Sequence, residues 1–258
     1  MRDILRSALL LACLGGVAQA DPLFSNSVVS NDIEFLQAND LSAFSCVRQI
    51  EQRRAEMPDK RNNGLFVDNV AVFRAAYTDG SSTEIWVHPG VGAQAGTQLA
   101  RDVAERVGLL PTLMRKKLDH VVIHQGDETA FSEDQGRFFV LYSENIRTRL
   151  RNHDLEETIF HESVHATLDV PMANSSAWKR AQRRDGDFVT EYGADIPRSE
   201  DLAESALFAW AYFFHADRLP AEVRDGLGDI MPNRLAFFHE VFVASGPNFQ
   251  QIGPDTGC

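Results

Sequence analysis

The chain has 258 residues, of which 44% are hydrophobic and 24% charged, so it is long and apolar enough to bury a sizeable core. This composition excludes a wholly disordered chain. The formal net charge of −12, from 25 Lys+Arg and 37 Asp+Glu, argues against nucleic acid or anionic lipid as the main partner.

The first twenty residues have the pattern of a cleavable signal peptide. A weakly basic start precedes an apolar stretch over 8–17 that is too short to span a bilayer, and Ala18-Gln19-Ala20 matches a cleavage site. We therefore expect cleavage after Ala20 and a secreted or periplasmic mature chain over 21–258, with no transmembrane segment. The alternatives are a buried N-terminal helix and a lipoprotein acylated on Cys13.

Two cysteines, Cys46 and Cys258, remain after cleavage. In an oxidising compartment they can form a disulfide that would join the C-terminal tail to the first expected helix of the mature chain. Two free thiols, or a metal-bound Cys46 thiolate that keeps a precursor inactive, are the alternatives. Residues 21–60 could also cover a cleft before processing, and the sequence leaves this open.

The first half of the mature chain predicts a mixture of strands and helices. Residues 21–40 have no regular pattern, whereas 41–57 carry helix-forming residues up to Pro58. Asp79-Gly80 then separates two β-rich segments as a hairpin turn would. The expected elements of this half are a helix over 41–57, strands over 70–77 and 83–88, a helix over 97–110, and strands over 119–124 and 137–142.

The second half predicts helices only, and no linker separates it from the first. We therefore expect one α+β domain over 21–258, with a small twisted sheet in its first half and a helical second half. The expected helices cover about 144–151, 155–168, 175–184, 199–215, 220–229 and 232–243.

A metal-binding pattern, His161-Glu162-x-x-His165, lies within the expected helix over 155–168. Residues four apart lie on one face of a helix, so both imidazoles can reach one Zn²⁺ at about 2.0–2.1 Å. Glu162 projects about 100° away from His161 and can serve as a base for a water molecule at the metal. Random placement would produce this pattern only about 0.015 times in such a chain. The alternative is two ordinary helical histidines beside a solvated glutamate.

A catalytic zinc site needs a third protein ligand and an open position. Glu200 and Glu204 lie four residues apart on the expected helix over 199–215, with Ser199 as its N-cap. One can bind the metal while the other accepts a hydrogen bond from a ligating histidine. Asp201 is a further candidate ligand, and the alternative for all three is an acidic first turn that complements the helix dipole.

The segments HExxH, T-E-Y-G-A and S-E-D-L-A-E together resemble the gluzincin branch of zinc metallopeptidases. Within that branch they are similar to the catalytic domain of anthrax lethal factor and related secreted bacterial peptidases, over about residues 115–215. The resemblance implies a zincin-like fold, with Glu200 as the third zinc ligand. It also implies that Glu204 accepts a hydrogen bond from a ligating histidine and that Tyr192 stabilises the oxyanion. The loop between the motifs does not align with that pattern.

These patterns predict a zinc-dependent endopeptidase with a peptide or protein substrate. His161, His165 and Glu200 would hold one Zn²⁺, and Glu162 would be the general base. The strand over 137–142 would be the edge strand along which a peptide binds, although its sequence is equally compatible with a core strand. The alternative functions are a catalytically silent zinc-binding module for protein interaction and a structural protein with an accidental motif. The natural substrate, the cleavage preference and the oligomeric state stay open.

Other polar residues have simpler interpretations. His120 and His124 are four apart on an expected strand, which places them about 13 Å apart, too far to share a metal. Asp154 has the position of an N-cap for the HExxH helix. Asp169 could orient a ligand histidine but is more typical of a helix end, and the acidic loop over 127–134 lacks the regular spacing of a calcium site.

Overall fold

The computed structural model describes residues 21–62, 64–133 and 135–244. The expected signal peptide, Cys13 and Cys258 lie outside these residues, so cleavage after Ala20 and the Cys46–Cys258 bridge stay predictions. The strands are β1 Phe44–Asp59, β2 Gly64–Tyr77, β3 Ser82–Val87, β4 His120–His124, β5 Phe131–Glu133 and β6 Phe138–Tyr142. The α-helices are α1 Ala93–Val107, α2 Thr112–Arg115, α3 Ser143–Asn152, α4 Leu155–Leu168, α5 Ser176–Asp185, α6 Glu191–Asp195, α7 Asp201–Phe214, α8 Ala221–Ile230 and α9 Pro232–Phe238. Short 3₁₀ or π turns are η1 Val28–Ser30, η2 Pro89–Val91, η3 Asp169–Ala173, η4 Ala216–Arg218 and η5 His239–Val243.

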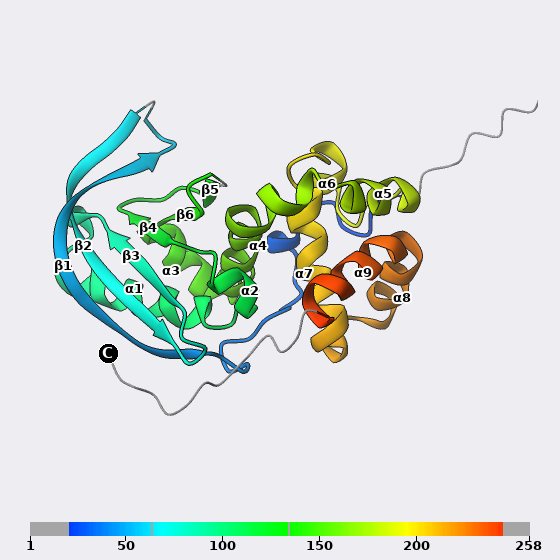
Figure 1. Cartoon of the computed structure of the whole chain (residues 1–258), viewed down its shortest axis with the longest axis horizontal. Coiled ribbons are helices and arrows are strands. Elements are labelled where there is room, and N and C mark those ends of the chain that lie inside the picture. Colours follow the sequence, from blue (N-terminus) through cyan, green and yellow to red (C-terminus); the bar gives the residue numbers. More distant parts are fainter. Residues whose placement is uncertain (1–20, 63, 134, 245–258) are drawn as a thin grey trace, which may run out of the picture.

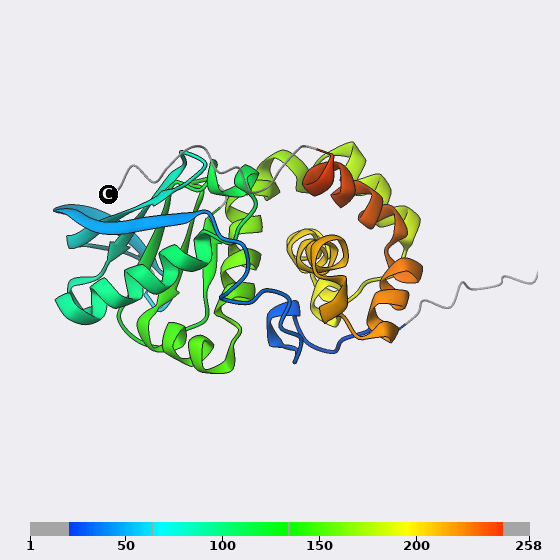
Figure 2. The same ribbon diagram turned by 90° about the horizontal axis from the view of Figure 1, so that it is seen from below.

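The described chain is a mixed α+β structure with one six-stranded sheet, in the order β1-β2-β3-β4-β6-β5. The β1–β2 and β2–β3 pairs are antiparallel, β3–β4 and β4–β6 are parallel, and β5 returns antiparallel to β6. The expected hairpin between β2 and β3 is confirmed, and Gly80 in its turn has a φ of 77°, which favours glycine. Helices α1 and α3 cover one face of this sheet (Figure 2).

The expected helix over 41–57 is wrong, because this segment forms most of the long strand β1. β1 pairs with β2 from Phe44 opposite Tyr77 to Asp59 opposite Gly64. Its last residues alternate with period two, with Ala55 and Met57 buried between less buried neighbours. Pairing with the next strand, β2, therefore overrides the local helix propensity. Pro58, which looked like a helix stop, is tolerated here because β1 lies at the edge of the sheet.

The strand over 137–142 was expected at the edge of the sheet, and this is also wrong. The corresponding strand β6 lies between β4 and β5, and its wholly apolar sequence suits burial on both faces. The edge beside the HExxH helix is formed by β5, a three-residue strand within the acidic loop over 127–134. The loop was expected to carry no strand.

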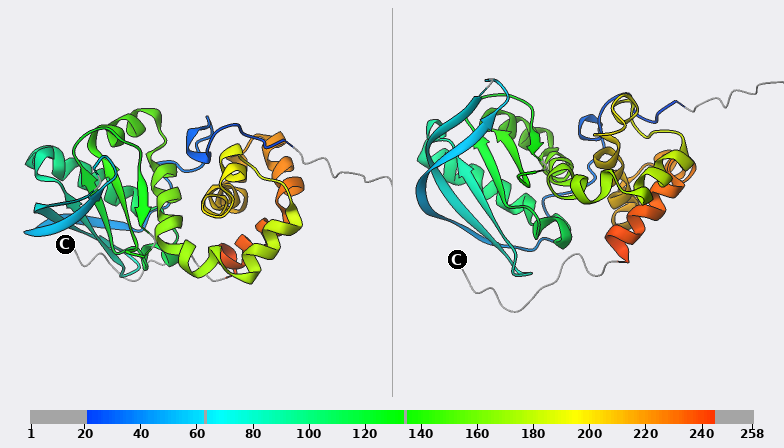
Figure 3. Two further views of the ribbon diagram at one scale, coloured as in Figure 1. Left: turned by 90° about the horizontal axis from the view of Figure 1, so that it is seen from above. Right: turned by 45° about the horizontal axis from the view of Figure 1, so that its top comes forward.

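The helical half of the molecule surrounds α7. Figure 2 shows α7 end-on, with α5, α8, α9 and the N-terminal segment around it. Helix α4 lies between the sheet and this helical group, as Figures 1 and 3 both show. In the part of the chain that the structure describes, no helix is long and apolar enough to cross a membrane.

Candidate metal centre

The HExxH motif lies on α4, whose bounds Leu155–Leu168 match the expected helix over 155–168. Asp154 is at the N-cap position as expected, but its side chain makes no capping hydrogen bond and accepts from Arg149 instead. The backbone carbonyl of Asp154 accepts from both the amide and the hydroxyl of Thr158. Every residue of α4 except His165 is buried, because the helix packs against both the sheet and α7. The uncharged residues around the motif allow this burial, which holds the histidine backbone rigidly.

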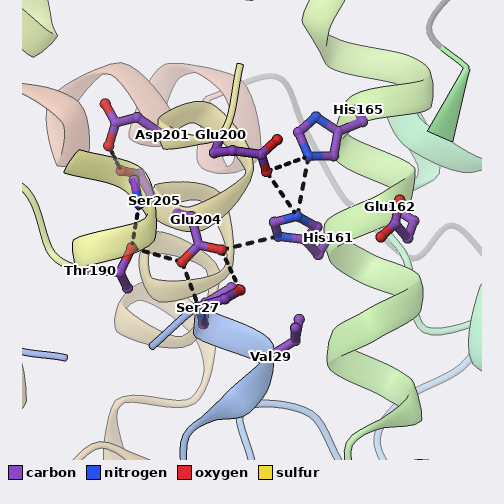
Figure 4. Close-up of polar contacts among 12 residues, drawn as sticks. Ser27, Val29, His161, Glu162, His165, Thr190, Glu200, Asp201, Glu204 and Ser205 are labelled. Atoms are coloured by element: carbon purple, nitrogen blue, oxygen red, sulfur yellow. Dashed lines mark hydrogen bonds and ion pairs between the residues drawn. The ribbon is translucent and has the colours of Figure 1, made fainter. Parts of the chain in front are cut away.

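Three donor atoms from α4 and the start of α7 converge on one point (Figure 4). His161 Nε2 lies 3.1 Å from His165 Nε2. Glu200 Oε2 lies 3.5 Å from His161 Nε2 and 3.2 Å from His165 Nε2. In a tetrahedral site with bonds of about 2.0–2.1 Å, neighbouring ligand atoms are about 3.3–3.4 Å apart. The three separations bracket this value, so the donor set fits Zn²⁺ in both chemistry and spacing.

Glu200 occupies the N-cap position of α7, one residue later than the expected cap, Ser199. Burial raises the pKa of Glu200, but hydrogen bonds from His161 and His165 outweigh burial and lower the pKa to about 2. Burial lowers the pKa of His165, but its hydrogen bonds with Asp169 and Glu200 raise it to about 10. The carboxylates therefore create a strongly negative environment that attracts a cation, whether a proton or a metal ion.

Each ring also faces a carboxylate on the side away from the donor cluster. His165 Nδ1 lies 2.8 Å from Asp169 Oδ2, at the end of the same helix. His161 Nδ1 lies 3.6 Å from Glu204 Oε1, on the next turn of α7 after Glu200 (Figure 4). Such carboxylates fix the tautomer in which Nδ1 carries the proton and Nε2 is available to a metal.

A cleft of about 340 Å³ opens in front of the donor atoms. It is lined by Ala130, Phe131, Ser132, His161, Glu162, His165, Asp169, Tyr192, Ser199 and Glu200. The Ser132 hydroxyl, on β5, lies 2.5 Å from Glu162 Oε2 and 2.8 Å from the Glu162 backbone oxygen. A larger groove of about 630 Å³ between α5 and α9 contains none of the donor atoms, so the chemistry belongs to the smaller cleft.

Tyr192 comes from α6, a short helix that the sequence did not predict. Its side chain is 38% exposed and lines the cleft. Burial raises the pKa of Tyr192, and nearby Glu200, Glu204 and Glu162 raise it further. Its hydroxyl therefore keeps its proton at neutral pH and can donate a hydrogen bond into the cleft.

Asp201 is not brought to the cluster. It points into the helical core, where Arg234, Ser205 and Gln182 donate to its carboxylate. The Arg234 guanidinium also pairs with Asp185, and both partners are fully buried, so this network has a structural role.

His120 and His124 also lie away from the cluster, on β4. The His120 ring stacks between Trp86 and Phe138, and His124 Nε2 lies 2.9 Å from the Pro58 carbonyl oxygen.

Sequence reasoning missed Ser132 and the hydroxyl of Ser27, which donates to Glu204 over a distance of 2.6 Å. Ser27 is 177 positions away from Glu204 along the chain, so no local pattern connects them. The only available signal for Asp169 was its spacing of four residues from His165 on one helix face.

Glu157, one turn before His161, gives a testable pH dependence of stability. Its side chain is buried; the Leu36 amide donates to Oε1, whereas Oε2 has no hydrogen-bond partner among the described residues. Burial raises the pKa of Glu157 from 4.5 to about 8, although the Leu36 amide lowers it slightly. As pH rises from about 4.5 to about 8, the unfolded chain releases this proton before the folded chain does, so the free energy of unfolding falls.

We therefore expect Glu157→Gln to raise the Tm at pH 8 by about 4 °C or more, since roughly 1 kcal/mol is worth about 2–4 °C in a chain of this size. At pH 5 the variant and the wild type should unfold at similar temperatures. Thermal unfolding followed by circular dichroism measures both. Glu144→Gln, at an exposed position on α3, is the control and should change neither value. An equal effect of Glu157→Gln at both pH values would contradict the assignment.

The donor cluster, the cleft and Glu162 are the observations from which a function can be proposed. Comparisons with models of protein families, with curated proteins and with solved structures find no match to this chain.

Proposed function

We propose that this protein is a zinc-dependent endopeptidase with a zincin-like catalytic centre, acting outside the cytoplasm after removal of residues 1–20. One observation carries the proposal. Three donor atoms of His161, His165 and Glu200 lie within 3.5 Å of one another at the wall of a cleft that also contains Glu162 and Tyr192. The sequence resemblance to gluzincins supports the same interpretation.

Zinc held by these three residues would supply a Lewis acid that lowers the pKa of water and polarises a carbonyl group. Glu162 would take the proton from the attacking water and deliver it to the leaving amine. Ser132 holds one oxygen of the Glu162 carboxylate, so the other oxygen is free to accept that proton. The Tyr192 hydroxyl would donate to the carbonyl oxygen as negative charge develops on it.

The neighbouring strand supports an extended peptide as the substrate. β5 forms the edge of the sheet in the described part of the chain, and Phe131 and Ser132 of β5 line the cleft. An extended chain can add to such an edge through backbone hydrogen bonds, which places a scissile bond without requiring a particular side chain.

Tyr192→Phe is expected to lower kcat by about a hundredfold to a thousandfold, because one donor to the developing oxyanion is lost. Zinc content and KM should stay close to the wild-type values, since the hydroxyl contributes only as charge develops. Steady-state kinetics on a cleaved peptide, together with elemental analysis, test this. A variant that turns over at the wild-type rate would remove Tyr192 from the mechanism.

The proposal as a whole is tested by incubating the mature protein with a peptide library and identifying the products by mass spectrometry. We expect internal cleavage that stops when zinc is removed with a chelator and returns when zinc is added. A protein that binds zinc yet cleaves no peptide would instead favour the silent interaction module.

A further inference from the structure

The N-terminal segment of the described chain is bound tightly to the helices that carry the metal centre. We name residues 24–36 the N-terminal strap. At one end, the Phe24 amide donates to the Val189 carbonyl, and the Glu191 amide donates to the Phe24 carbonyl. At the other end, the Leu36 amide donates to Glu157 on α4. Between them, Arg149 donates to the Val29 carbonyl, so both ends and the middle of the strap are fixed.

Among the described residues, three hydrogen bonds hold the Glu204 carboxylate, and the strap supplies two of them (Figure 4). The Ser27 hydroxyl donates to Oε1 over 2.6 Å, and the Val28 amide donates to Oε2 over 2.7 Å. The Thr190 hydroxyl provides the third, to Oε2 over 2.8 Å. Glu204 is only 1% exposed, so water cannot readily replace these donors.

Glu204 in turn faces the ring of a candidate metal ligand. His161 Nδ1 is buried and has no hydrogen-bond partner among the described residues, and Glu204 Oε1 lies 3.6 Å from it. A shortening of about 0.6 Å would give an ordinary N–H···O hydrogen bond. A histidine that binds metal through Nε2 carries its proton on Nδ1, so the orientation of Glu204 determines how well His161 can act as a ligand.

The strap does not lie over the cleft. The residues that line the cleft begin at Ala130, and none comes from residues 21–40. Figure 4 shows Ser27 beneath the Glu204 carboxylate and His161 to its right. A segment in this position supports the ligands and does not block access to them.

We propose that the N-terminal strap completes the metal centre, with Ser27 as a positioning residue that holds Glu204 against His161. This inference rests on the proposed function, because it assigns the strap a role in metal binding. It also makes residues 24–36 a permanent part of the active protein and not a removable propeptide. Loss of the strap by proteolysis would therefore reduce metal affinity although every ligand remains.

The test compares zinc affinity, by competition with a chromogenic chelator, in the mature wild type and in three variants. Ser27→Ala should bind zinc more weakly by about tenfold or more. This is the typical loss when a residue that orients a metal ligand is substituted. Ser27→Thr keeps the hydroxyl and should restore an affinity close to that of the wild type. Ser25→Ala is the matched control, since Ser25 is exposed on the same segment, and should bind as the wild type does.

The absorption spectrum of the Co²⁺-substituted protein distinguishes positioning from general stabilisation. A purely structural role for Ser27 would lower the Tm of Ser27→Ala and leave both the Co²⁺ spectrum and the zinc affinity of the folded protein unchanged, which would overturn the inference. If the wild type binds zinc and Ser27→Ala binds it equally well, only the role of the strap is rejected. If the wild type binds no zinc, the proposed function fails as well.

Hydrogen exchange provides a second readout that does not depend on a variant. Coupling between two binding events is reciprocal. Bound zinc should therefore stabilise the docked strap by the same free energy by which the docked strap stabilises bound zinc. We expect the peptide that contains Val28 to exchange more slowly when zinc is bound. Exchange that is unaffected by zinc would contradict the coupling.

Discussion

Glu162→Gln is expected to lower kcat by about a thousandfold, within the range that general acid–base catalysis provides, while zinc stays bound. Glutamine has the same shape and still accepts a hydrogen bond from Ser132, but it cannot take a proton from water. The three candidate ligands are unchanged, so metal affinity should fall only slightly. Steady-state kinetics and elemental analysis on one preparation measure both quantities.

Glu133→Gln is the matched control for this variant. Glu133 lies on β5, next to Ser132, and its side chain is exposed and does not line the cleft. Its turnover should equal that of the wild type. Full activity in Glu162→Gln would reject Glu162 as the base, and loss of zinc together with activity would show that the substitution disturbs the ligands instead.

Glu200→Ala is expected to weaken zinc binding by more than about a hundredfold. That exceeds the typical loss of metal affinity when a residue that only hydrogen-bonds to a ligand is substituted. Among the described residues, Glu200→Ala removes the only carboxylate with an oxygen within 3.5 Å of Nε2 of both His161 and His165. The pKa of Glu200 is lowered to about 2, so this carboxylate supplies its full negative charge at neutral pH. Chelator competition gives the affinity, and circular dichroism shows whether the variant folds.

Comparing zinc retention in Glu200→Ala and Glu162→Gln shows whether the loss of zinc is specific to Glu200. Both variants remove a carboxylate from the same cleft, but only Glu200 is expected to touch the metal. Equal zinc retention in the two variants would exclude Glu200 as the third ligand. Asp201 would not then take its place without a large rearrangement, because its carboxylate is held by Arg234.

The HExxH helix was predictable because its signals are local. Asp154 occupies the N-cap position, and uncharged residues surround the motif, so the expected range 155–168 agrees with α4. The helical spacing of His161 and His165 then places both rings on one face. Glu200 could be proposed because a catalytic zinc site needs a third ligand, but its approach to α4 depends on how α7 packs.

The errors concern how elements pair and pack, which the local sequence pattern did not reveal. Residues 41–57 have helix-forming side chains, yet β1 forms because β2 offers a partner along its whole length. β5 and not β6 forms the edge of the sheet, because three residues of the acidic loop pair with the buried strand β6. The contact of Ser27 with Glu204 likewise depends on the packing of the whole helical half.

The central claim is that His161, His165 and Glu200 together hold one zinc ion, and elemental analysis tests it most directly. The mature protein should contain one zinc per chain after purification, lose it to a chelator and regain it on addition of zinc. His161→Ala, prepared in the same way and shown to be folded, should contain none above background. Wild-type protein without zinc, or an equal zinc content in His161→Ala, would contradict the account.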